Sequence, residues 1–141
     1  MVKANMDGDL SPRRHTIRRV SKDWTPFGRQ LAQVLSLLEE DQFLILSAKR
    51  GNRYLQFSCQ GSWGMRVEVT SNHFLKGDER LTRREMAWLS AHGWNAPTGK
   101  PEQATPDRDP DGSPNYYIDF PTAVPTSDIV GVVIDTLIHG L

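Results

Sequence analysis

The residues whose types and spacing come nearest to a known chemistry are three aspartates in a proline-rich stretch. The motif is Asp107-x-Asp109-x-Asp111-Gly112, in which alternate carboxylates and a glycine at the sixth position match the start of a calcium-binding loop. The twelfth position, where a bidentate glutamate should complete such a site, is Ile118. We therefore interpret the stretch as a solvated acidic loop and expect no metal, although the carboxylates leave a cation site as an alternative.

Histidine and cysteine, which most often carry catalysis or metal binding, do not cluster in this sequence. The single cysteine, Cys59, alternates with Leu55 and Phe57, which predicts a small buried apolar side chain rather than a nucleophile. No phosphate-binding, dinucleotide-binding or nucleophile-elbow motif is present. We therefore expect no catalytic residues and no cofactor, and a protein that is not an enzyme. An unrecognised active site is the alternative. The histidines are His15, His73, His92 and His139.

Length and composition indicate one globular domain. The chain has 141 residues, of which 38% are hydrophobic, and its 17 basic side chains balance 17 acidic ones. That length fits a single domain, and no apolar stretch approaches the roughly 20 residues that a membrane helix needs. One cysteine suits a reducing compartment, where disulfides are rare. We therefore expect a cytoplasmic protein that does not bind membranes.

Charge and proline content divide the chain into a tail, a domain and a loop. Residues 1–22 carry six basic and two acidic side chains and few large apolar ones, which predicts a flexible basic tail. Residues 23–141 form one α+β domain, in which five prolines predict a long loop at 95–114. The arginine pairs within residues 11–22 support an alternative hypothesis, a nucleic-acid-binding or regulatory role for the tail. Two pairs are a sparse tract, so we do not expect nucleic acid as the main partner.

Hydrophobic spacing predicts the elements of this domain. A first helix begins at Thr25, a capping residue, with Pro26 in its first turn. Strands at 42–48, 53–59 and 63–70 follow, joined by tight turns as an antiparallel meander, and the first is apolar on both faces, as in the interior of a sheet. One face of the first helix is apolar: Phe27, Leu31, Val34, Leu35 and Leu38.

The second half of the domain completes the fold. Thr82 and Glu85 form a capping box at the start of a second helix, and Gly93 fits the left-handed position that ends it. A fourth strand spans residues 115–120, and Thr126 or Ser127 caps a last helix. The order is α-β-β-β-α-β-α. The expected fold class is α+β, with an antiparallel sheet of a three-strand meander plus a later strand and helices packed mainly on one face.

A single layer of helices leaves the other face of this sheet uncovered. Exposed apolar surface marks partner sites, and a free edge strand can add an extended peptide. We expect a peptide segment of a client protein, or a second copy of the chain, to bind there. Which face or edge binds is left open. The residues expected to form the peptide-binding surface are Tyr54, Gln56, Trp63, Phe74 and Tyr117.

Short motifs also resemble a known family. Arg53-Tyr54-Leu55-Gln56-Phe57 is similar to the "YVQF" strand of the YbjN and type III secretion chaperone-like superfamily. Further similarity lies in Met65–Val69 with Ser71-Asn72-x-Phe74-Leu75, in Leu81–Leu89 with Gly93-Trp94, and in Asn115–Pro121. The resemblance implies a secretion-chaperone-like fold and a non-enzymatic, often homodimeric module that holds peptide segments of partner proteins on hydrophobic surface. The proline-rich loop and the basic tail are additions to the family pattern.

Overall fold

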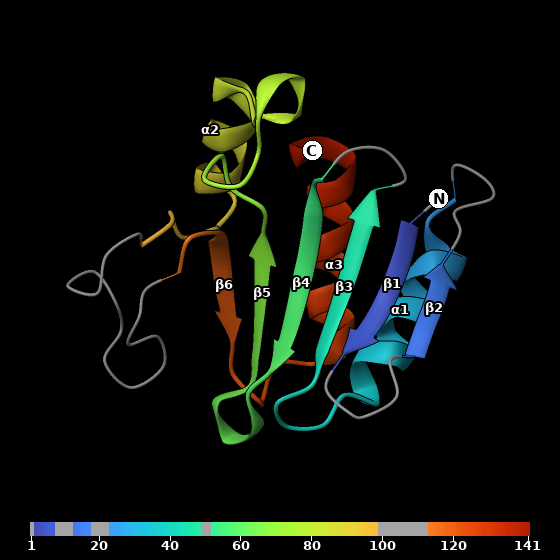
Figure 1. Cartoon of the computed structure of the whole chain (residues 1–141). Coiled ribbons are helices and arrows are strands. Elements are labelled where there is room, and N and C mark those ends of the chain that lie inside the picture. Colours follow the sequence, from blue (N-terminus) through green and yellow to red (C-terminus); the bar gives the residue numbers. More distant parts are fainter. Residues whose placement is uncertain (1, 8–12, 18–22, 49–51, 99–112) are drawn as a thin grey trace.

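The structure is a computed structural model that describes residues 2–7, 13–17, 23–48, 52–98 and 113–141. It confirms the α+β class and the element order from the first helix onward. Figure 1 shows α1 and α3 behind one face of an antiparallel sheet, with α2 beyond the last residues of β5 and the first residues of β6. The elements are β1 (Val2–Asp7), β2 (Arg13–Ile17), α1 (Thr25–Ser36), β3 (Phe43–Ala48), β4 (Tyr54–Cys59), β5 (Met65–Val69), α2 (Arg83–Ala91), β6 (Tyr116–Phe120) and α3 (Thr126–Asp135).

The sheet has two strands that the sequence did not indicate. Its order is β2-β1-β3-β4-β5-β6, and β1 pairs antiparallel with β3 from Val2 opposite Ala48 to Asp7 opposite Phe43. The expectation of a tail without regular structure is therefore wrong for β1 and β2; the other residues of 1–22 lie outside the described part. These strands are held by backbone hydrogen bonds, β1 to the edge of β3 and β2 to β1. Because every residue type except proline can form such bonds, the amino-acid composition of the segment does not reveal them. The pairing with β1 also confirms β3 as an interior strand.

The core lies between α1, α3 and the face of the sheet that they cover. The predicted apolar face of α1 is buried, and α3 adds Ile129, Val130 and Val133. Alternation along the strands sends every second side chain toward these helices. The strand residues buried in this way include Leu44, Leu46, Leu55, Phe57, Val67 and Val69. We call the opposite side of the sheet the open face.

Two predicted helix caps are wrong. At α1 the carboxylate of Asp23 accepts a hydrogen bond from the Thr25 backbone N–H at 2.9 Å, so Asp23 does the capping expected of Thr25. Hydrogen bonds from Thr25 hold the pKa of the Asp23 carboxyl below its usual value. At α3 the residue in the N-cap position is Pro125, and no side chain caps this end. The Pro125 carbonyl accepts hydrogen bonds from the backbone N–H groups of Asp128 and Ile129, which begins the helix without a polar side chain.

The predicted third strand starts two residues later than expected. Trp63 lies in a 3-10 turn, η1 (Gly61–Trp63), and its side chain is 49% exposed. Gly64 follows with φ 94° and ψ −140°, and β5 begins only at Met65. A Cβ on Gly64 would meet the carbonyl oxygen of Phe120, so this turn packs directly on the end of β6. The close approach requires glycine.

The second helix is held by the predicted capping box and by one arginine. The Thr82 hydroxyl accepts from the Glu85 backbone N–H at 3.1 Å, and the Glu85 carboxylate accepts from the Thr82 backbone N–H at 2.9 Å. The Arg53 guanidinium donates to both carboxylate oxygens of Glu85, at 2.6 and 3.2 Å. It also donates to the carbonyls of Glu79 and Arg80. Arg53 therefore ties the start of β4 to the N-terminus of α2.

Glu85 makes the attachment of α2 sensitive to pH. Burial alone would raise the pKa of Glu85, but hydrogen bonds from Arg53 and Thr82 outweigh it and hold that pKa below its ordinary value. Because the pKa of Glu85 is lower in the folded chain than in the unfolded chain, its carboxylate stabilises the fold at a pH above the unfolded-state pKa. This stability is lost as the pH falls through the folded-state pKa. We expect Glu85→Gln to lower the free energy of unfolding by about 1–2 kcal/mol at neutral pH.

Urea unfolding of the wild-type and Glu85→Gln chains through the acid range measures this effect. The difference between them should close as the Glu85 carboxylate becomes protonated. A difference that stays constant with pH would contradict the role given to this ion pair.

Candidate peptide-binding site

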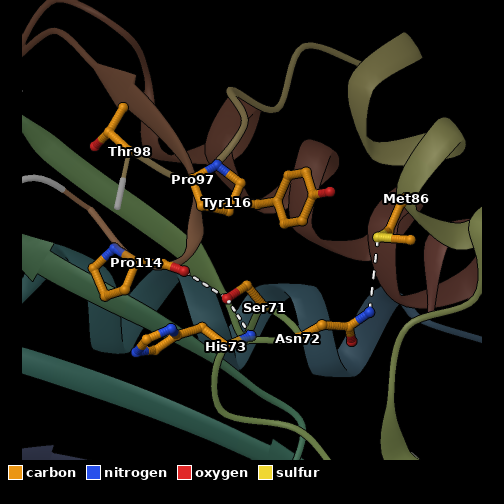
Figure 2. A pocket seen from close by; sticks show the side chains of 8 residues that line it. All are labelled: Ser71, Asn72, His73, Met86, Pro97, Thr98, Pro114 and Tyr116. Carbon is orange, nitrogen blue, oxygen red and sulfur yellow. Dashed lines mark hydrogen bonds between the residues drawn. The ribbon is translucent and has the colours of Figure 1, made fainter. Parts of the chain in front are cut away.

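A pocket of about 400 Å³ lies where α2 faces the end of β5 and the start of β6. Figure 2 shows its side chains converging from these elements and from the two ends of the proline-rich loop. We call this hollow the α2 pocket. It is lined by Ser71, Asn72, His73, Met86, Pro97, Thr98, Pro114 and Tyr116.

The polar groups on one side of the α2 pocket are already paired within the protein. Asn72 donates from Nδ2 to the Leu81 carbonyl at 3.0 Å and accepts at Oδ1 from the Leu81 N–H at 2.6 Å. The Ser71 hydroxyl donates to the carbonyl of Pro114, and the Ser71 backbone N–H donates to the side-chain oxygen of Asn115. The Ser71 bonds join the segment after β5 to the segment before β6, and the Asn72 bonds join it to Leu81, just before α2. Hydrogen bonds therefore connect the segments on this side of the pocket.

The remaining walls of the α2 pocket are largely apolar. They come from the Met86 side chain, the rings of Pro97 and Pro114, and the ring of Tyr116, which in Figure 2 lies beside Pro97 with its hydroxyl on the Met86 side. Burial raises the pKa of the Tyr116 hydroxyl. A tyrosine hydroxyl is neutral at physiological pH even without this shift, as suits a mostly apolar hollow.

Phe74 does not line this pocket, but it contacts His73, which does. Its side chain is 48% exposed and packs edge-on against His73, with ring centroids 4.8 Å apart. A large apolar ring that is half exposed is surface that a partner can contact. Of the five residues that the sequence indicated, none lines the α2 pocket, and Phe74 contacts a residue that does.

Three of the other expected residues lie on the open face. Tyr54 and Gln56 are on β4 and Tyr117 is on β6, and in the sheet register Gln56 and Tyr117 flank Glu68 of β5. The Tyr54 hydroxyl accepts a hydrogen bond from Asn115 at 3.4 Å. The three therefore share one face and one end of the sheet.

The open face differs from the apolar surface that the sequence predicted. Arg66, only 5% exposed, donates to both oxygens of Asp119 at 2.7 and 2.9 Å. Its guanidinium carbon lies 4.5 Å from the centre of the Tyr117 ring. Arg66 and Glu68 alternate with apolar residues along β5, and the pairing of Arg66 with Asp119 makes this a mixed surface. Among the residues described on this face, Phe43 is a large apolar side chain that stays exposed, at 36%.

Trp63 and Phe74 do not belong to one site. Trp63 precedes β5 and Phe74 follows it, so the five residues of that strand, roughly 16 Å long, separate them. The five predicted residues therefore fall into three places.

The outer edge of β6 is partly covered, because Asn95 exchanges two backbone hydrogen bonds with Tyr117, at 2.9 and 3.2 Å.

The residues that sequence reasoning missed are those of the α2 pocket itself. Tyr116 lies in the predicted fourth strand and is buried, but it also lines the pocket. Pro97 and Pro114 close the ends of the predicted loop, and proline clusters signal a loop without saying what the loop packs on. Only the sheet pairing brings these residues to Met86.

The described part of the chain holds no cluster of metal-ligating side chains and no helix suited to span a membrane. No group of three or more His, Cys, Asp or Glu side chains in it could hold a metal ion. The aspartate motif at 107–112 lies outside the described residues. Among the helices that the structure describes, none combines the length and apolar character that crossing a membrane requires.

Comparison with known families decides the relationship. A family model described as T3SS (YopN, CesT) and YbjN peptide-binding chaperone 3, or TY-Chap3, matches residues 17–138. The chain belongs to the TY-Chap3 family. The match confirms the resemblance seen in the sequence motifs. Comparisons with curated proteins and with solved structures gave no match.

The match shows which part of the structure is the TY-Chap3 domain. It begins at Ile17, the last residue of β2, and runs to Ile138, so it includes every residue that lines the α2 pocket. Strand β1 lies outside it. The family description names peptide binding and no reaction. A chaperone-like role is therefore the function that the family supports.

Proposed function

We propose that this TY-Chap3 chain binds an extended segment of a client protein and that an apolar side chain of the client enters the α2 pocket. The observation that supports this most is the pocket itself: a preformed hollow of about 400 Å³ with Met, Pro and Tyr walls in a domain of a peptide-binding family. In this proposal the chain carries out no reaction of its own.

The energetics favour an apolar anchor. Burying one leucine or phenylalanine side chain is worth about 1.5–3 kcal/mol, or roughly ten- to hundredfold in Kd. The Met86 side chain is unbranched and adapts to differently shaped partners. Because Ser71 and Asn72 already have backbone partners, an entering apolar group leaves these hydrogen bonds intact. The pocket therefore selects for apolar side chains without demanding one shape.

The expected binding residues take different parts in this proposal. Phe74 contacts the client beside His73, whereas Tyr54, Gln56 and Tyr117 contact residues that flank the anchor. Trp63 lies beyond the far end of β5 and has no part in this site. The homodimer and the cytoplasmic location expected from the sequence stay predictions.

Calorimetry with a pair of short synthetic peptides tests the proposal. One peptide carries a single leucine in a polar sequence, and the other has serine in its place. We expect Met86→Glu, which puts a charge in the pocket, to weaken binding of the leucine peptide at least about tenfold, to the level of the serine peptide.

The neighbouring substitution Ala87→Glu is the matched control, because Ala87 is exposed on the same helix and does not line the pocket. It should bind as the wild-type chain does. Phe74→Ser, at an exposed position, should give an intermediate loss without affecting the fold. Equal binding by the Met86→Glu and Ala87→Glu chains, both folded by circular dichroism, would refute the proposal.

A further inference from the structure

A second hollow, of about 250 Å³, lies on the open face beside the α2 pocket. Pro114 lines both hollows, so a bound segment that passes over Pro114 reaches each of them. We call this second hollow the sheet groove. Its lining residues are Asp41, Phe43, Gln56, Ser58, Cys59, Gln60, Arg66, Glu68, Ser113 and Pro114.

The charge in the sheet groove is net negative. Its lining contains two carboxylates, Asp41 and Glu68, and one cation, Arg66. Both oxygens of Asp119 accept hydrogen bonds from Arg66, so the charge of that cation is offset by a carboxylate outside the lining. Glu68 accepts a hydrogen bond from the Ser113 hydroxyl at 3.3 Å. The groove therefore attracts cations and repels anions.

The two carboxylates are spread along the groove rather than clustered. Asp41 donates its backbone N–H to the Cys59 carbonyl, and Glu68 lies opposite Gln56. Their backbone positions are thus three residues apart along β4, roughly 10 Å. A metal ion needs its ligands within one coordination shell, so this spacing does not suit one. A long cationic side chain does fit it.

Two further features of the lining suit a side chain that is both apolar and rich in donors. Phe43 presents an exposed ring, on which an aliphatic stem packs or over which a cation lies. The Oε1 atom of Gln60 is buried and accepts no hydrogen bond from the described residues. Rotation of this amide toward a bound donor would satisfy it. Buried acceptors without a partner are rare in native proteins and call for an explanation.

We propose that the sheet groove accepts an arginine or lysine side chain of the client, next to the apolar residue that enters the α2 pocket. The aliphatic stem packs on Phe43, and the charged group lies toward Asp41 or Glu68. This inference rests on the proposed function and adds the chemical class of client that the chain prefers: an extended segment with an apolar residue and a basic residue close together.

Calorimetry with a second peptide pair tests the inference. Both peptides carry the leucine anchor; one has a nearby arginine, and the other has citrulline, its uncharged isostere. At low ionic strength the wild-type chain should bind the arginine peptide about tenfold more tightly, and added salt should reduce the ratio. In the Asp41→Asn/Glu68→Gln double variant the ratio should fall below about twofold.

Glu39→Gln is the matched control, since Glu39 is exposed near Asp41 but does not line the groove. It should keep the tenfold preference. An unchanged ratio in the double variant, or no preference in the wild-type chain, would overturn the inference. If both peptides bind equally through leucine, the proposed function survives alone. If neither binds, the proposed function fails as well.

Discussion

Replacing Asp119 with alanine should lower the free energy of unfolding by about 3 kcal/mol. The Arg66 guanidinium is almost fully buried on the open face, and Asp119 accepts two of its hydrogen bonds. Removing this carboxylate leaves a buried cation without its main counter-charge, which costs far more than losing an exposed ion pair. Urea unfolding at neutral pH measures the loss.

A double replacement separates the cost of an unpaired charge from the value of the pair. Arg66→Met with Asp119→Leu removes both charges and keeps apolar volume, so its loss should be clearly smaller than that of Asp119→Ala. A loss below about 0.5 kcal/mol for Asp119→Ala would show that water solvates the Arg66 guanidinium or that another side chain pairs with it. Asp119 would then not be the group that offsets the charge of Arg66.

The second large effect is expected at Gly64. An alanine there would have to adopt φ 94° and ψ −140°, and its Cβ would meet the backbone carbonyl of Phe120. We expect Gly64→Ala to lower the free energy of unfolding by about 3–4 kcal/mol, because both the backbone strain and the clash with β6 oppose folding.

Gly131→Ala is the comparison for this substitution. Gly131 lies in α3, and nothing lies within 4 Å of a Cβ built on it. Since alanine favours a helix, this variant should gain about 0.5–1 kcal/mol. Similar thermal stability for the Gly64→Ala and wild-type chains would mean that the turn before β5 does not pack on β6.

Local chemistry explains what the sequence could predict. The Thr82 and Glu85 capping box and the left-handed Gly93 are decided by neighbours a few residues apart, and both are present in the structure. Alternation along 53–59 likewise placed Leu55 and Phe57 on the buried side of β4, whereas Cys59 is only partly buried. The family motifs lie in these same segments, which is why the resemblance was visible.

Long-range pairing explains what the sequence could not predict. Nothing in the composition of residues 2–7 indicates that Val2 lies opposite Ala48. The α2 pocket has the same origin, since it joins Met86 to residues at both ends of the proline-rich loop. The mixed character of the open face was within reach of sequence reasoning, because Arg66 and Glu68 alternate with apolar residues along 63–70. Giving these charges more weight than the tyrosines would have predicted it.

The most direct test of the central claim follows the methyl groups of the methionines by NMR. Met86 lines the α2 pocket, whereas Met65 lies at the start of β5, at the far end of the sheet, and serves as an internal control. In a chain labelled with ¹³C at the methionine methyls, Met86→Leu identifies the resonance to follow. The leucine peptide should shift the Met86 signal saturably and leave Met65 in place, and the serine peptide should shift neither. Binding of the leucine peptide that leaves the Met86 signal unmoved would contradict a client anchor in the α2 pocket.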